Sequence, residues 1–209
     1  VVEVSSFQME HTHTAKPDVA VILNVLENHL DRHGDLDTYG QLKLKLCSKQ
    51  DERYVVVLNS DDDFLRTHTN SLPQRTTWFG HTRESRWKVE DSTVMLVESG
   101  KVHEVLRHTE WKLPGEHNLL NAAAASAAAE AVGVSIESIR NGLLAATPVE
   151  HRIEFVRELN KVRYYNDSKS TNLTATLTAI AAVQGQITLL FGGRPKQESF
   201  TPLAKLVGN

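Results

Sequence analysis

Short runs of aliphatic and β-branched residues, without the polar alternation of a half-exposed strand, constrain this fold more than any other sequence feature. The clearest runs are Val19–Val25 and Tyr54–Leu58, and Val1–Val4 and Ile187–Phe191 have a similar character. Such runs are typical of strands buried on both faces of a sheet. Because helical patterns separate them, the sequence predicts an α/β fold with a parallel sheet and flanking helices.

Two helices between these runs are clearly marked. The alanine-rich segment His117–Val132 favours a helix, and Gly133 follows it where helices commonly end. Ser135 is the expected N-cap of a second helix that continues to Ala146. A third segment, Leu42–Leu46, alternates Leu and Lys like a strand, but the acidic residues before it favour a capped helix, which we expect.

From Thr76 to Arg107 the pattern changes to short alternating stretches, which predict a small antiparallel side sheet. The stretches are Thr77–Phe79, Arg86–Val89, Thr93–Val97 and Lys101–Leu106. At Thr147–Glu150 a proline follows the second helix and a strand-rich segment begins. We therefore place a domain boundary there, with one domain over residues 1–149 and another over residues 150–209.

Composition excludes several classes of protein. With 23 Lys and Arg against 26 Asp and Glu, the net charge of −3 gives no general attraction to nucleic acid or anionic membranes. No apolar run approaches the roughly 18 residues that cross a bilayer. The first residues do not resemble a signal peptide, and the single cysteine, Cys47, fits a buried thiol in a reducing cytosol. We expect a cytoplasmic protein.

Polar residues that could bind a ligand follow the first two predicted strands. Glu3 and Ser5-Ser6 stand at the end of the first strand, and the second is followed by Asn24, Glu27, His29 and Asp31. The carboxyl ends of parallel strands meet at one edge of the sheet, so these side chains could share a crevice. Carboxylate, imidazole and oxygen donors would hold Mg²⁺ or Mn²⁺ there. The alternative is a set of ordinary surface loops.

A second polar group, Asn166–Asn172, follows an aromatic strand. A helix that begins there would offer backbone N–H groups to an anion, although an ordinary strand-to-helix turn has the same pattern. Further on, Gly192-Gly193 precedes Lys196, which could bind a carboxylate or phosphate. The 209 residues contain no Gly-x-x-x-x-Gly-Lys-[Ser/Thr] loop, the usual cradle for ATP phosphates.

Taken in order, these motifs resemble those of the Mur ligase family. The matching segments are Glu3-Val-Ser-Ser-Phe-Gln-Met-Glu10, Asn24-Val-Leu-Glu-Asn-His-Leu-Asp-Arg-His33, Gly115-Glu-His-Asn-Leu-Leu-Asn121, His151-Arg-Ile-Glu154, Asn166-Asp-Ser-Lys-Ser-Thr-Asn172 and Gly192-Gly-Arg-Pro-Lys196. They extend over nearly the whole chain. The Ser-Ser-Phe-Gln, His-Arg-x-Glu and Asn-Asp-Ser-Lys elements are most similar to the members that add D-glutamate.

The resemblance implies a three-domain fold, of which this chain holds about half. Residues 1–149 would be part of the central ATPase domain, and residues 150–209 would begin a Rossmann-like C-terminal domain. The N-terminal UDP-binding domain and the glycine-rich ATP loop are expected to be absent. The complete form is expected to be a monomer.

The resemblance also implies an ATP-dependent, ADP-forming ligase of peptidoglycan synthesis. In that reaction ATP phosphorylates the carboxylate of UDP-N-acetylmuramoyl-L-alanine, and the amine of D-glutamate attacks the acyl phosphate and expels phosphate. Both steps gather negative charge, which metal ions and cationic side chains stabilise. The expected cofactors are therefore ATP, as co-substrate, and Mg²⁺ or Mn²⁺.

Matching positions imply roles for individual residues. Glu3 and His29 match metal-associated positions, and Lys43 matches a lysine that the family carries as a carbamate, an anionic oxygen ligand. Lys45 is the competing register for that lysine. The expected catalytic residues are Lys43, Arg152 and His29. The expected nucleotide-binding residues are Asn118, Asn121, His151, Arg152 and Asp167. The expected substrate-binding residues are Lys169, Thr171 and Lys196.

Other functions remain open at this level. The chain by itself could be an inactive fragment that binds a metal or a nucleotide, and this is the expectation for the 209 residues alone. Another Mur-type or folylpolyglutamate-type ligase is an alternative for the parent protein. A metal-dependent hydrolase could use the Glu and His cluster, but it would leave Asn166–Asn172 without a role.

Overall fold

A computed structural model describes residues 1–47, 54–69, 72, 75–193 and 199–207. In chain order the regular elements are α1 (Ser6–His11), β1 (Val19–Ile22), α2 (Leu30–His33), α3 (Leu36–Leu44), β2 (Val55–Asn59), α4 (Asp63–His68), β3 (Arg75–Gly80), β4 (Trp87–Glu90), β5 (Thr93–Glu98), β6 (Lys101–Arg107), the 3-10 helix η1 (His108–Glu110), α5 (Glu116–Ala131), α6 (Ile136–Ala145), β7 (Glu154–Leu159), β8 (Val162–Asn166), α7 (Leu173–Ala182) and α8 (Thr201–Val207).

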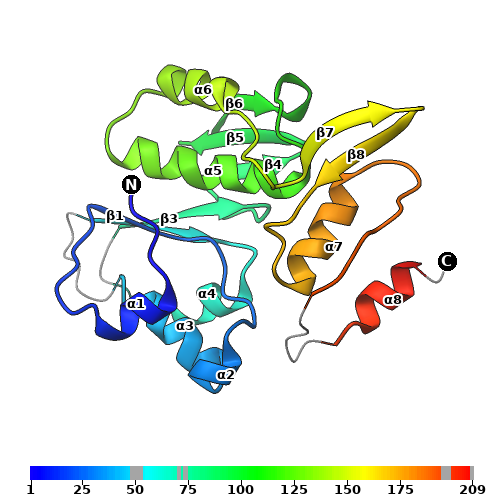
Figure 1. Ribbon diagram of the computed structural model, residues 1–209. Helices are drawn as coiled ribbons and strands as arrows, with labels where there is room; N and C mark the ends of the chain where they lie inside the picture. The colour runs from blue at the N-terminus through cyan, green and yellow to red at the C-terminus, as the bar shows by residue number, and fades with distance from the viewer. Residues whose placement is uncertain (48–53, 70–71, 73–74, 194–198, 208–209) are drawn as a thin grey trace.

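The large sheet has six strands in the order β1-β2-β3-β4-β5-β6. Strands β1 to β4 are parallel neighbours, and β4, β5 and β6 pair antiparallel. Helices α5 and α6 cover one face of this sheet, and α1, α3 and α4 lie on the other (Figure 1). The prediction of an α/β fold with a parallel sheet and flanking helices is confirmed.

Strand β2 shows why an unbroken apolar run predicts this arrangement. Side chains alternate along a strand, so Val55 and Val57 belong to the core beneath α5, whereas Val56 and Leu58 belong to the core beneath α3 and α4. All four side chains are buried. A strand covered on both faces needs apolar residues at every position, and the run Tyr54–Leu58 supplies them.

The antiparallel strands predicted between residues 76 and 107 are present, with two corrections. Strand β3, which includes Thr77–Phe79, is parallel to both of its neighbours. The other three strands continue the large sheet, and the small antiparallel sheet is the β7–β8 hairpin instead. Alternation of side chains is the same in parallel and antiparallel strands, so it could not reveal the direction of pairing.

Two predicted strands are wrong. Neither Val1–Val4 nor Ile187–Phe191 forms a strand, and both segments are exposed. A strand requires a neighbour that accepts and donates its backbone hydrogen bonds, and no strand of the described part of the chain pairs with either segment. Apolar composition alone therefore misidentified them.

The predicted helices are confirmed close to their expected bounds. The Ala side chains of α5 pack against the sheet, and Gly133 ends the helix with a φ of 85°. The side chain of Ser135 accepts a hydrogen bond from the backbone of Ser138 at the start of α6. Helix α3 includes most of the ambiguous Leu42–Leu46 stretch.

The end of α3 leads to the single cysteine. Cys47 is fully buried, and burial raises the pKa of its thiol to about 12. The prediction of a buried, unreactive thiol is therefore consistent with its surroundings. None of the helices in the described ranges is long and apolar enough to cross a membrane.

The hairpin and the last helices follow α6. Asn160 and Lys161 form the two-residue turn of the β7–β8 hairpin, and their φ angles of 51° and 64° are those of the turn type that suits a tight hairpin. Helix α7 begins only at Leu173, after the whole polar group Asn166–Asn172. The boundary proposed near residue 149 falls between α6 and β7.

Candidate functional site

Hydrogen bonds connect the segment after β1 to residues at the end of β2 and just after it, at the carboxyl edge of the sheet. The side-chain amide of Asn59 donates to the carbonyl of Leu23 at 2.9 Å. The buried carboxylate of Asp62 accepts the backbone N–H of Val25 at 2.6 Å and that of Leu65 at 2.9 Å. The polar segment around Asn24 is thereby fixed beside the end of β2.

Lys43 reaches the same loop from α3. Its Nζ donates to the carbonyl of Asn24 at 2.6 Å and lies 5.0 Å from the ring centre of Tyr39. Burial lowers the pKa of the Lys43 amine, and the nearby Asp62 carboxylate opposes this shift. The competing lysine, Lys45, turns elsewhere and donates to the carbonyls of α1 at Met9 and Glu10.

His29 has an unusual backbone conformation. Its φ of 54° lies in the left-handed region, which only a small share of non-glycine residues adopt. The side chain of Asn28 accepts its N–H at 3.1 Å, and its carbonyl accepts the N–H groups of Arg32 and His33. The imidazole packs edge to face on Phe7 with ring centres 5.0 Å apart. Such strained positions are common at functional sites.

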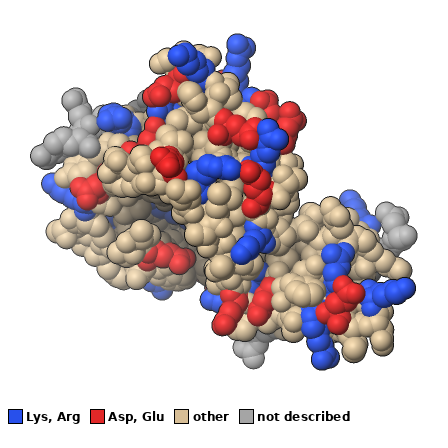
Figure 2. Space-filling view, turned by 90° about the horizontal axis from the view of Figure 1, so that it is seen from above, with Lys and Arg blue, Asp and Glu red and all other residues tan. Residues whose placement is uncertain are grey.

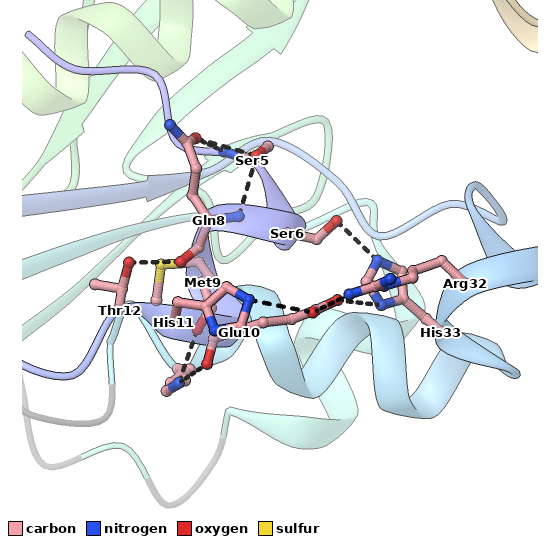
Figure 3. Close-up of polar contacts among 10 residues, drawn as sticks. Ser5, Ser6, Gln8, Met9, Glu10, His11, Thr12, Arg32 and His33 are labelled. Atoms are coloured by element: carbon pink, nitrogen blue, oxygen red, sulfur yellow. Dashed lines mark hydrogen bonds and ion pairs between the residues drawn. The ribbon is translucent and has the colours of Figure 1, made fainter.

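Helix α1 follows the segment that carries Glu3. Glu3 itself is exposed, whereas Ser5 caps the helix through reciprocal contacts with Gln8. Figure 3 shows that Ser6 turns inward to His33, with its Oγ 3.0 Å from the ring Nε2. Glu10 lies on the other side of the same imidazole.

Lys43 and the carbonyl of Asn24 are therefore in direct contact, whereas His29 is connected to Lys43 only through the rings of Phe7, His33 and Tyr39. Among the described residues, no group of three or more His, Cys, Asp or Glu side chains could hold a metal ion. Glu3 is exposed, and a lysine ammonium would repel a divalent cation. The carboxylate of Glu3 and the imidazole of His29 would fit a metal only if a further oxygen were added.

A second set of contacts joins the end of β8 to the loop before β7. We call it the hinge cluster: His151, Arg152, Glu154, Asn166 and Asp167. The side-chain amide of Asn166 is 2.8 Å from His151 Nδ1, and Glu154 accepts the N–H of His151 at 2.8 Å. Asp167 accepts the N–H of Ile153 at 3.0 Å.

Backbone strain is also present in the hinge cluster. His151 has a φ of 67° and Ile153 a φ of 46°, which is a clear outlier for a β-branched residue. Ile153 is buried, and the Asp167 carboxylate holds its N–H. These contacts hold the strained backbone in place, and His151 and Arg152 are exposed.

The start of α5 lies next to the hinge cluster. Burial lowers the pKa of the His117 imidazole. The negative charge of Asp167 opposes this shift, and the positive charge of Arg152 strengthens it. Asn118 donates to the carbonyl of Pro114 at 2.7 Å, and Asn121 donates to Asn118 at 3.3 Å. His117, at the start of α5, is therefore near enough to Asp167 and Arg152 to be affected by their charges, and Asn118 is the next residue of the helix.

The residues expected at the amino-acid substrate are less constrained. Lys169 is exposed, and its backbone N–H donates to the carbonyl of His151 at 3.1 Å. Thr171 is exposed just before Asn172, whose side chain accepts the N–H of Ala175 and so already caps α7. Lys196 lies outside the described residues.

Two groups of residues at this edge were missed by sequence reasoning. One is Asp62, which holds Val25. The other is centred on His81, which follows β3. Its Nδ1 lies 2.7 Å from the carboxylate of Asp61, and its Nε2 lies 3.2 Å from that of Glu116. His81 therefore joins the ends of β2 and β3 to the start of α5. Asp61 and Asp62 follow the buried strand β2 after only Ser60, so the strand-end argument could have found them.

On the face seen in Figure 2, no patch of a single charge is evident among the described residues. Figure 2 shows basic and acidic side chains intermixed over the face in view, rather than one patch of a single sign. The arrangement as a whole offers a partly buried amine and an imidazole at the strand ends, and amide, imidazole and carboxylate groups at the hinge cluster.

Comparison with known proteins agrees with the motifs. A model of the Mur ligase middle domain matches residues 1–129. The chain is 40% identical over 209 residues to the UDP-N-acetylmuramoylalanine–D-glutamate ligase of Pelotomaculum thermopropionicum, and 38% identical over 211 residues to that of Acidobacterium capsulatum. Each match covers 99% of this chain and 46% of the relative, so the chain spans about half the length of the curated relatives it matches.

Solved structures show the same fold. MurF from Acinetobacter baumannii superposes with a TM-score of 0.68 at 25% identity, covering 79% of this chain and 37% of that one. MurF ligase from Thermotoga maritima, in complex with ADP, superposes with a TM-score of 0.64 at 22% identity, covering 86% and 42%. Since the family model matches more than half of the residues and the fold agrees, the chain belongs to the Mur ligase family.

Proposed function

We propose that this chain is part of an ATP-dependent, ADP-forming ligase that joins D-glutamate to UDP-N-acetylmuramoyl-L-alanine in peptidoglycan synthesis. The observation that carries the proposal is the match of 99% of this chain to curated ligases at 38% and 40% identity. At the start of α5, His117 lies within reach of the charges of Asp167 and Arg152. The names of the curated relatives support the choice of D-glutamate.

The proposed division of the chain follows from this site. Residues 1–149 would belong to the central ATPase domain, and residues 150–209 would begin the Rossmann-like domain that binds the amino acid. In this division the hinge cluster would stand at the start of the second unit, and α5 would belong to the first. A nucleotide bound between them would contact both units, and the parent enzyme would be a monomer.

The reaction would proceed through an acyl phosphate. The substrate carboxylate attacks the γ-phosphorus of ATP and ADP leaves; the D-glutamate amine then attacks the acyl carbon and phosphate leaves. Arg152 is exposed on the strained loop and would meet the phosphates, where its fixed positive charge would offset the charge of the transferred group. Asn118, Asn121, His151 and Asp167 would bind the nucleoside.

Lys43 would take part as a carbamate. Carbamate formation requires the neutral amine to attack CO₂, and burial lowers the pKa of this amine, which favours the neutral form. The product would be anionic and would supply the oxygen that Glu3 and His29 lack for holding Mg²⁺ or Mn²⁺. A bound divalent cation would neutralise negative charge on the reacting groups. Lys169, Thr171 and Lys196 would face D-glutamate.

We infer that the 209-residue chain alone binds nucleotide without turnover, because it spans about half of its relatives and its sequence contains no glycine-rich phosphate loop. The test is phosphate release in the presence of ATP, UDP-N-acetylmuramoyl-L-alanine, D-glutamate and Mg²⁺. The full-length Pelotomaculum thermopropionicum ligase is the positive control.

A chimera in which residues 1–209 replace the matching half of that relative decides the outcome. D-glutamate-dependent phosphate release by the chimera, lost on Arg152→Ala, supports the proposed function. Hydrolysis that requires neither D-glutamate nor nucleotide would favour a metal-dependent hydrolase. Turnover by the bare chain would contradict the inference that it is inactive.

A further inference from the structure

Three aromatic or imidazole rings form a continuous row between His29 and Lys43. Phe7 packs on His29 with ring centres 5.0 Å apart and on His33 at 5.3 Å. His33 packs on Tyr39 at 5.4 Å, and the Lys43 amine lies 5.0 Å from the Tyr39 ring centre. His33 is thus the middle member of a row that ends at two residues of the proposed site.

The ring of His33 is held by polar contacts on both nitrogens. Its Nε2 lies 3.0 Å from the hydroxyl of Ser6, and its Nδ1 lies 3.5 Å from a carboxylate oxygen of Glu10. Arg32 holds Glu10 from the other side with two donors, at 3.2 and 2.7 Å (Figure 3). The His33 side chain is only 2% exposed, so it has little freedom to rotate.

The order of these groups is hydroxyl, imidazole and carboxylate, which is also the order in hydrolases with a serine nucleophile. Ser6 and His33 are both buried, however, with 7% and 8% of their surfaces exposed. A substrate could not reach the Ser6 hydroxyl in this arrangement. The contacts therefore suit a positioning role better than a catalytic one.

We propose that His33 is a positioning residue that fixes Phe7 and Tyr39, and through them the orientation of His29 and Lys43. The significance of this role rests on the proposed function, in which His29 and Lys43 belong to the metal site. The positions come from three separate elements: Phe7 lies on α1, His33 on α2 and Tyr39 on α3. A single buried imidazole between them fixes their relative placement.

Ring-current shifts in NMR spectra of the ligand-free chain test the proposal. Protons of His29 lie beside the Phe7 ring, and the terminal methylene of Lys43 lies near the Tyr39 ring, so both should be displaced from their random-coil positions. The signals are assigned from their loss in His29→Gln and Lys43→Arg. In His33→Ala, both sets of signals should lose most of that displacement.

His68→Ala is the matched control. His68 also contacts one carboxylate, Asp37 at 3.3 Å, and one ring, Phe64 at 4.0 Å, but it is outside the row. This variant should leave the His29 and Lys43 signals unchanged. Ser6→Ala removes a single polar contact of His33, with little change in volume, and should shift both signals partly toward random coil.

Unchanged His29 and Lys43 signals in folded His33→Ala overturn the proposal. If that variant does not fold, unchanged signals in Ser6→Ala overturn it instead. Because no nucleotide or metal is present in these samples, the result is independent of the ligase assay. If the His29 and Lys43 signals respond to His33→Ala but the chimera is inactive, the positioning role of His33 is supported and the proposed function is rejected.

Discussion

Replacing Asp62 with alanine removes the carboxylate that joins the loop after β1 to the start of α4. In the structure this side chain is 8% exposed and accepts the N–H of Val25 at 2.6 Å and of Leu65 at 2.9 Å. The Leu65 contact is an N-cap, whose loss costs about 1 kcal/mol. The buried N–H of Val25 would be left without an acceptor, which costs about 1–3 kcal/mol.

We therefore expect Asp62→Ala to lower the free energy of unfolding by about 2–4 kcal/mol, measured by urea denaturation followed by far-UV circular dichroism. A serine in Asp62→Ser can still cap α4 but cannot accept the N–H of Val25. The free energy of unfolding of this variant should therefore lie between those of wild type and Asp62→Ala. Asp35→Ala is the matched control, because Asp35 caps α3 through the N–H of Thr38 at 2.7 Å but is exposed. Its effect should be smaller.

The reasoning is refuted if Asp62→Ala destabilises the chain no more than Asp35→Ala does. That result would mean that the Val25 contact contributes nothing beyond a helix cap. It would also remove the physical basis for a fixed Asn24 carbonyl, which accepts the hydrogen bond from Lys43.

Three further predictions concern the framework around the site. Burial favours a higher pKa for Glu130, but hydrogen bonds from Arg86 and Trp87 outweigh burial, and the pKa of this carboxyl is lowered. The ionised side chain therefore stabilises the folded chain at pH values above the pKa of the unfolded state. This stabilisation is lost as the pH falls through the pKa of the folded state. Wild type should therefore lose its stability advantage over Glu130→Gln between about pH 5 and pH 3, measured by urea denaturation; an advantage independent of pH would contradict this. Cys47 is buried with a pKa of about 12, so Ellman's reagent should label it slowly in the native chain and rapidly in urea; rapid native labelling would show that the thiol is accessible. Lys161→Gly should slow amide exchange in β7 and β8, because glycine adopts the turn's φ of 64° without strain; faster exchange would argue against that turn.

Much of the fold could be predicted from local patterns. The run Tyr54–Leu58 predicts β2 because both faces of that strand are covered, and Ser135 predicts the start of α6 because it satisfies a backbone N–H of the first turn. Val1–Val4 and Ile187–Phe191 have similar composition but no neighbouring strand in the described chain. Pairing depends on residues far along the sequence, so composition alone could not separate these cases.

The site was predictable in its residue types but not in its geometry. The strand-end argument selected Asn24 and His29, and a family resemblance selected Lys43, but no sequence pattern indicates that the Lys43 amine meets the Asn24 carbonyl. The left-handed backbones of His29 and His151 were equally hidden, because no local sequence pattern marks such a conformation at a histidine. The role of Lys196 stays a prediction, since it lies outside the described residues.

The most direct test of the account is ADP binding to the 209-residue chain, followed by backbone amide NMR. Wild type should bind ADP weakly and saturably, with shifts concentrated at Asn118, Asn121 and the hinge cluster, and Asp167→Ala should weaken binding. Failure to bind, or shifts confined to residues away from the start of α5 and the hinge cluster, would contradict a nucleotide site between them.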